Sequence, residues 1–158
     1  MPNIADSPFK SISILYRKSH IWLNDGCTQY NLTGAQAVVI LVVCDFKMLT
    51  QDGITKRLSL DKSVIAKTVT KLEEMGFLVR TISTKDRRTY DIRPTEKAWD
   101  VYPFVKRQMD KCFTRMTQQM TDVERAEFER LLVLAVESSI SLDNLSATID
   151  RKMMHSDG

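Results

Sequence analysis

Cationic side chains suited to binding phosphate are concentrated in one quarter of this chain. Residues 56–93 hold ten Lys and Arg and five Asp and Glu, a net charge of +5, whereas the other residues hold thirteen basic and fifteen acidic groups, or −2. The total of +3 therefore hides a basic segment. A charge run is usually a solvated face, but a local excess of this size beside ordered elements indicates a surface that contacts phosphate groups.

The centre of the basic segment has the pattern of an amphipathic helix. Asp61 is a suitable N-cap because its carboxylate can accept hydrogen bonds from free amide groups of the first turn, and Gly76 suits the left-handed residue just past a helix end. Ile65, Val69 and Leu72 recur on one helical face and predict contact with a core. The other face carries the candidate contacts to phosphates or base edges, namely Lys62, Ser63, Ala66, Lys67, Thr70 and Lys71.

A β-hairpin with a cationic tip is predicted directly after this helix. Residues 77–82 and 89–93 are rich in β-branched and aromatic side chains, which favour strands. The tip between them carries Lys85, Arg87 and Arg88 as candidate nucleic-acid contacts. Asp86 is anionic, so its expected role is to orient one of these arginines.

Capping residues and apolar periodicity predict five further helices. Their N-cap candidates are Ser7, Thr33, Thr50, Thr95 and Thr121. The first helix is expected over residues 9–25, with a break at Asp25-Gly26. The helix opened by Thr95 is expected to reach about Gln119, and a polar tail is expected from Asn144 onward.

This order of elements predicts a mainly α (α+β) protein built on a winged helix-turn-helix. Long terminal helices with apolar faces and no partner in a small central domain usually find one in a second copy of the chain, so we expect a homodimer. The expected division is an N-terminal dimerisation helix (1–32), a winged helix-turn-helix domain (33–95), C-terminal dimerisation helices (96–145) and a flexible tail (146–158).

Several classes of protein receive no support from the sequence. The longest apolar run, residues 37–44, is far shorter than the roughly 20 residues that cross a bilayer, and no export signal is visible, so we expect a cytoplasmic protein without a membrane segment. Cys27, Cys44 and Cys112 are widely spaced and form no C-x-x-C pair. With no Gly-rich phosphate loop and no recognisable acid–base cluster, we expect no enzyme activity, no metal and no cofactor.

Over about residues 9–142 the chain resembles the MarR family of bacterial winged-helix transcription regulators. The most specific part is the run from Ser63 to Gly76, where Lys67, Lys71 and Leu72 match the family's basic, basic and leucine positions. The tip Asp86-Arg87-Arg88 matches the family's Asp-x-Arg pattern. Thr33-x-x-Gln36 matches the start of its second helix. Pro94 and Ala98 differ from the family's usual Leu and Gly at the exit of the wing.

The resemblance implies a homodimer that binds double-stranded DNA, with the helix at Asp61 in the major groove and Arg88 in the adjacent minor groove. A two-fold dimer of this type reads a palindrome with half-sites roughly 10 base pairs apart. A repressor is favoured over an activator because a dimer bound at a promoter excludes polymerase. The alternative is a winged-helix module that binds a protein.

The resemblance also implies regulation. A small aromatic effector is expected in a crevice beside the first helix, where the candidate lining residues are Tyr16, His20, Trp22 and Tyr30. Thiol-based redox sensing is a further alternative. It depends on Cys27, which is expected in an exposed loop after Gly26.

Overall fold

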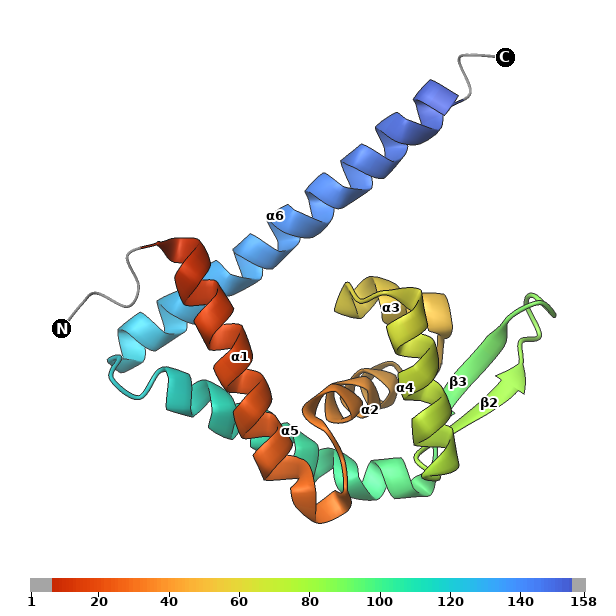
Figure 1. Ribbon diagram of the computed structural model, residues 1–158, viewed down its shortest axis with the longest axis horizontal. Helices are drawn as coiled ribbons and strands as arrows, with labels where there is room; N and C mark the ends of the chain where they lie inside the picture. Colours follow the sequence, from red (N-terminus) through yellow and green to blue (C-terminus); the bar gives the residue numbers. More distant parts are fainter. Residues whose placement is uncertain (1–6, 155–158) are drawn as a thin grey trace. The chain divides into compact units, whose positions relative to one another are not determined.

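The computed structural model describes the backbone of residues 7–154 and the side chains of residues 7–144. Its elements are α1 (Pro8–Cys27), the short 3-10 helix η1 (Thr28–Tyr30), α2 (Gly34–Phe46), β1 (Leu49–Thr50), α3 (Gln51–Leu58), α4 (Lys62–Glu74), β2 (Leu78–Ile82), β3 (Tyr90–Pro94), α5 (Glu96–Met116) and α6 (Asp122–Met154) (Figure 1). The chain divides after Met116 into two units. The mainly helical winged-helix fold expected from the sequence is confirmed.

The predicted capping residues stand at the start of all five helices, and all but Ser7 accept a capping hydrogen bond through the side chain, including Thr95 Oγ1 from Ala98 N at 3.4 Å. Gln36 N donates to Thr33 Oγ1 at 3.2 Å, while Thr33 N donates to Gln36 Oε1 at 2.9 Å, which completes a capping box at the start of α2. Thr50 Oγ1 accepts from Gly53 N at 3.1 Å at the start of α3. Thr121 forms a second capping box at the start of α6.

The N-cap of α4 differs from the expectation. Asp61 occupies the cap position with an extended backbone, but its side chain makes no capping hydrogen bond. The helix is nevertheless bounded where the sequence predicts. Gly76 has φ +78°, the left-handed conformation that glycine adopts at least cost.

The expected break of the first helix at Asp25-Gly26 is wrong. α1 continues through Gly26 to Cys27. A Cβ added at Gly26 would lie only 2.6 Å from Gln108 Oε1 of α5. Glycine at this position therefore leaves room for the end of the Gln108 side chain, a role that its helix-breaking tendency does not reveal.

The sheet has three antiparallel strands in the order β1-β3-β2. β1 was not predicted because two residues are too few to show a strand pattern. Pro94 lies opposite Leu78 at the end of the sheet, and Thr95 N then donates to Phe77 O at 3.0 Å. The wing exit is therefore regular despite Pro94.

The core of the first unit is formed by α2, by the inner faces of α1, α4 and α5, and by the strands. Ile65, Val69 and Leu72 of α4 are each fully buried, as their spacing predicts. Phe77 and Ile92 join them from the segments that flank the wing. Burial of these side chains fixes which face of α4 remains exposed.

The last two helices differ in length from the expectation. α5 passes through Pro103 and ends at Met116, before the expected Gln119. α6 continues to Met154, beyond Asn144, where the sequence predicts the start of a polar tail. Residues 155–158 of the expected tail lie outside the described residues.

Over the described residues, no single helix is both long and apolar enough to cross a membrane. The segments Pro8–Tyr30 and Gly34–Phe46 satisfy the length and composition criteria only as a pair, and they are bent by 77° relative to each other.

Candidate nucleic-acid interface

The polar face of α4 is exposed opposite its buried apolar face. Of the six candidate residues on this helix, only Ala66 is half-buried, and Lys62, Ser63, Lys67, Thr70 and Lys71 are exposed. A shallow hollow of about 340 Å³ lies on this face, lined by Ala66, Lys67, Thr70, Lys71 and Glu74. The residues predicted on this face therefore lie together on one accessible surface.

Two of these lysines form exposed ion pairs. Lys62 Nζ lies 3.2 Å from Asp52 Oδ1 of α3, and Lys71 Nζ lies 3.3 Å from Glu74 Oε2. Every side chain in the two pairs is more than half exposed. Exposed pairs of this kind are weak, so a phosphate can replace the carboxylate as the partner of either lysine.

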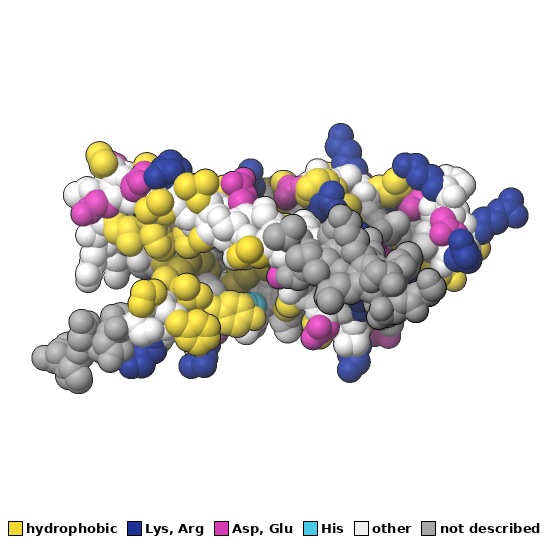
Figure 2. Space-filling model, turned by 90° about the horizontal axis from the view of Figure 1, so that it is seen from above, with side chains coloured by type: hydrophobic (Ala, Val, Ile, Leu, Met, Phe, Trp, Pro, Cys, Tyr) yellow, Lys and Arg dark blue, Asp and Glu magenta, His cyan; other side chains and the backbone are white. Residues whose placement is uncertain are grey.

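The wing adds exposed cations. Lys85, Arg87 and Arg88 are all exposed, and the Arg88 side chain retains 91% of its accessible surface. Figure 2 shows Lys and Arg side chains on the side of the view where Figure 1 places β2 and β3. The cationic tip and the polar face of α4 belong to the same unit.

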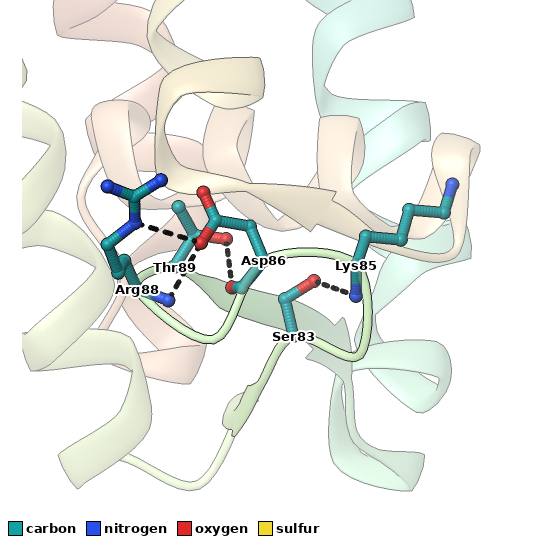
Figure 3. A network of polar contacts seen from close by, with 5 residues as sticks. All are labelled: Ser83, Lys85, Asp86, Arg88 and Thr89. Atoms are coloured by element: carbon teal, nitrogen blue, oxygen red, sulfur yellow. Dashed lines mark hydrogen bonds and ion pairs between the residues drawn. The ribbon is translucent and has the colours of Figure 1, made fainter.

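The tip of the wing is organised by a small network of polar contacts (Figure 3). Asp86 Oδ1 accepts from Arg88 N at 3.0 Å and from Arg88 Nε at 3.3 Å. Thr89 Oγ1 donates to Asp86 O at 3.0 Å, and Lys85 N donates to Ser83 Oγ at 3.3 Å. The contact expected between Asp86 and an arginine is present, and the arginine is Arg88.

One arginine that the sequence reading did not select links the wing to α4. Arg80 of β2 contacts both Thr70 and Glu73 of α4. Side chains alternate along β2, so Arg80 lies on the same face as the buried Leu78. A charged residue on an inward face requires a partner, and this alternation is the pattern in the sequence that identifies Arg80. The same arginine lines a hollow of about 220 Å³ with Arg88 and Tyr90.

The four candidate effector residues do not form one site. Tyr16 and His20 stack edge to face with ring centroids 4.4 Å apart, and Tyr30 packs on Phe104 at 4.8 Å. His20 lines an apolar cavity of about 220 Å³, which is also lined by Ser19, Leu23, Val38, Met109, Cys112 and Met116. Trp22 lines a different hollow of about 320 Å³, where the guanidinium carbon of Arg115 lies 5.0 Å from its ring centroid.

The expectation that Cys27 is exposed is wrong. Cys27 is the last residue of α1 and is fully buried, because the helix continues past Gly26 into the core. Burial, and then the nearby Cys112 thiol, raise the pKa of Cys27 above its ordinary value. Burial also raises the pKa of Cys44, to about 12. Buried thiols with a raised pKa are unreactive. The redox-sensing alternative depended on an exposed Cys27, so it no longer has a candidate residue.

No group of three or more His, Cys, Asp or Glu residues within the described part of the chain is arranged to hold a metal ion.

Comparison with known proteins finds a family-model match over the same region. Residues 30–89, which span α2 to the wing, match the MarR family model. The chain is 22% identical over 102 residues to YybA of Bacillus subtilis (strain 168), an uncharacterized HTH-type transcriptional regulator, covering 65% of this chain and 68% of that protein. It is 27% identical over 94 residues to a proposed transcriptional regulatory protein for the hcr operon of Thauera aromatica, covering 60% of this chain and 57% of the relative, which is less than two thirds of its length.

Solved structures extend the likeness to most of the chain. A MarR transcriptional regulator from Methanosarcina mazei Go1 superimposes with a TM-score of 0.80 at 25% identity, covering 84% of this chain and 96% of that one. A MarR family regulator from Listeria monocytogenes, crystallised with a 26mer DNA, shares the fold with a TM-score of 0.79 at 18% identity, covering 86% and 91%. The matched segment, the winged helix and the basic face of α4 together make the chain similar to the MarR family of transcriptional regulators.

Proposed function

We propose that this protein regulates transcription by binding specific duplex DNA sequences through α4 and the wing. The observation that carries the proposal is the two-sided character of α4, whose apolar residues are fully buried while its lysines remain exposed beside a cationic wing. A helix with this exposed face fits the major groove, and short polar side chains or lysines on it reach base edges and phosphates.

The proposed contacts follow from the positions of the side chains. α4 enters the major groove, while Arg88 enters the adjacent minor groove, where narrow A·T tracts concentrate negative potential. Lys85 and Arg87 bind phosphates, and Asp86 orients Arg88. The proposed contacts on α4 are Lys62, Ser63, Ala66, Lys67, Thr70 and Lys71.

We propose that the functional species is a homodimer. α1 exposes Phe9 (79%), Ile12 (64%) and Tyr16 (61%). Considered by itself, α6 exposes a second set of large apolar side chains, namely Val123, Leu131, Leu132, Val133, Leu134, Val136, Ile140 and Leu142. Apolar surface of this extent is unusual on a monomer. We therefore propose that a second copy of the chain buries it. In this proposal α1 and the C-terminal helices form the dimerisation region.

A two-fold dimer implies a palindromic operator with half-sites roughly 10 base pairs apart. Bound across a promoter, the dimer excludes polymerase, so the proposed regulatory effect is repression in the cytoplasm. Release by a small aromatic effector is proposed at the cavity lined by His20, since an apolar cavity with a few polar groups, here Ser19 and His20, suits such a ligand. Titration with benzoate and phenol, followed by the NMR signals of the His20 ring, tests this part of the proposal, and unchanged signals would contradict it.

The central experiment is selection of duplex fragments by the purified protein at two salt concentrations. We expect enrichment of a short palindrome and binding that weakens as salt rises, because phosphate contacts release counterions. Arg88→Ala should lose most of the enrichment. Arg107→Ala, which removes an exposed charge from α5, is the matched control and should retain it.

The absence of any enrichment from a dimeric protein would contradict the proposal. It would favour the alternative of a winged-helix module that binds a protein. Analytical ultracentrifugation of the same sample measures the oligomeric state, so failure to dimerise and failure to recognise DNA are separate outcomes.

A further inference from the structure

We propose that Arg80 is a positioning residue for sequence specificity, which holds the Thr70 hydroxyl so that it donates a hydrogen bond to an acceptor on a base edge. This inference rests on the proposed function, since it concerns how α4 reads DNA. It assigns to a residue of the wing strand a role in the chemistry of the recognition helix.

The geometry of Arg80 joins three elements. Its Nη2 group donates to Thr70 Oγ1 at 3.2 Å and also to Glu73 Oε2, so one nitrogen contacts two residues of α4. The Arg80 and Glu73 side chains are only 26% and 28% exposed. The guanidinium carbon of Arg80 also lies 5.8 Å from the ring centroid of Tyr90 on β3. Contacts on α4 and β3 therefore restrict the guanidinium to one position.

This position determines what the Thr70 hydroxyl can do. A hydroxyl has one hydrogen and two lone pairs, and one lone pair of Thr70 accepts from a cation. Within the described part of the protein, the Thr70 hydroxyl has no hydrogen bond in which it donates. Its hydrogen is therefore available, and the adjacent positive charge favours its use as a donor. In the major groove the acceptors are purine N7, guanine O6 and thymine O4.

Another threonine of α4 shows the contrasting arrangement. The Thr68 hydroxyl donates to Val64 O at 2.9 Å, within the helix itself. Its hydrogen is used by the backbone. Thr70 is exposed and lines the hollow on the polar face, so it is the threonine of α4 whose hydrogen remains available at that surface.

Arg80 is also incompletely bonded. Its Nε atom is buried and has no hydrogen-bond partner in the described structure. A buried donor left unpaired lowers the contribution that a side chain makes to stability. The arrangement therefore favours a role for Arg80 in orienting Thr70 over a role in stability alone.

The test measures binding to a set of operator duplexes, each with one substituted base pair. The operator is the palindrome obtained by fragment selection with the wild-type protein. Thr70→Val removes the hydroxyl, and Arg80→Met removes its partner while keeping a long aliphatic chain. We expect both variants to lose discrimination at the same base pair of each half-site, by about 10-fold, the effect of one good base contact. Thr70→Ser keeps the hydroxyl and should retain the wild-type discrimination at that base pair.

Arg93→Met is the matched control because it removes an exposed positive charge from the neighbouring strand. It should weaken binding to every duplex equally and leave the discrimination profile unchanged. The double variant Thr70→Val/Arg80→Met should lose no more discrimination at the affected base pair than either single variant loses. Circular dichroism checks that each variant is folded, and the Thr70 variants test the inference even if Arg80→Met unfolds.

Two results would overturn the inference. The first is that Arg80→Met and Arg93→Met discriminate between the operator duplexes in the same way. The second is that the Thr70 and Arg80 variants lose discrimination at different base pairs. In both cases the wild-type preference for the operator would remain, and the proposed function would stand. If the wild-type protein shows no sequence preference at all, the proposed function fails and the inference fails with it.

Discussion

Asp86 and Arg88 form a local contact in which a single carboxylate oxygen, Asp86 Oδ1, accepts from both the backbone N and the side-chain Nε of Arg88. The Arg88 side chain remains 91% exposed, so this contact orients the guanidinium without burying it. An exposed arginine that is already oriented loses less conformational entropy when it enters a groove.

The first prediction concerns this contact. Asp86→Ala removes a negative charge, which should strengthen binding to random-sequence DNA, and it frees Arg88, which should weaken selective binding. We therefore expect the ratio of operator affinity to random-duplex affinity to fall by several-fold, as measured by fluorescence anisotropy. Asp100→Ala removes an exposed carboxylate from α5 and should leave the ratio unchanged. An unchanged ratio in Asp86→Ala would show that Arg88 needs no orientation.

The second prediction concerns the buried face of α4. Leu72 is fully buried in the core, so Leu72→Ala should lower the free energy of unfolding by about 2–5 kcal/mol through lost burial and the cavity that remains. Val64 lies on the same helix but is 43% exposed, and Val64→Ala should cost well under half of that amount. Urea denaturation at a fixed protein concentration measures both. Equal losses in the two variants would contradict the observed orientation of α4.

The third prediction concerns the residue that ends α4. Gly76 has φ +78°, and a Cβ there would meet nothing closer than Lys97 Cδ at 3.9 Å. Gly76→Ala should therefore destabilise the protein through backbone strain alone, by about 1–2 kcal/mol. Gly76→Asn should cost less, since asparagine tolerates the left-handed region better. Thermal unfolding should give the highest melting temperature for the wild-type protein, a lower one for Gly76→Asn and the lowest for Gly76→Ala. An alanine variant more stable than the wild type would contradict the conformation assigned to Gly76.

The fourth prediction concerns the buried thiols. Burial raises the pKa of Cys44 from 9.0 to about 12, so the folded protein keeps this thiol protonated where the unfolded chain ionises. The folded state then binds more protons than the unfolded state between these values, and stability should fall as the pH rises from about 9 toward 12. Cys44→Ala should show a shallower decline in urea titrations over this range. A decline of equal slope in the variant would assign the effect to other groups.

Much of the fold follows from local sequence. The capping boxes at Thr33 and Thr121 require only residues within one helical turn, and the spacing of Ile65, Val69 and Leu72 determines which face of α4 is buried. The same periodicity places the polar candidates of α4 on a single surface. These features were predictable because their physical causes lie within a few neighbouring residues.

The errors occurred where distant residues decide the outcome. α1 continues two residues past the expected end, through Gly26 beside the Gln108 side chain of α5, to Cys27, which is buried. Residues of α5 line two different hollows beside α1, one with His20 and the other with Trp22, and that division depends on packing between the helices.

The sequence by itself determined the basic segment, the amphipathic helix α4 and the cationic wing, because charge and helical periodicity are local properties. Only the tertiary structure decided which thiols are buried and that Arg80 contacts Thr70 and Glu73. Those contacts depend on how β2 packs against α4. Packing between elements sets the distances between side chains, and those distances decide which hydrogen bonds form.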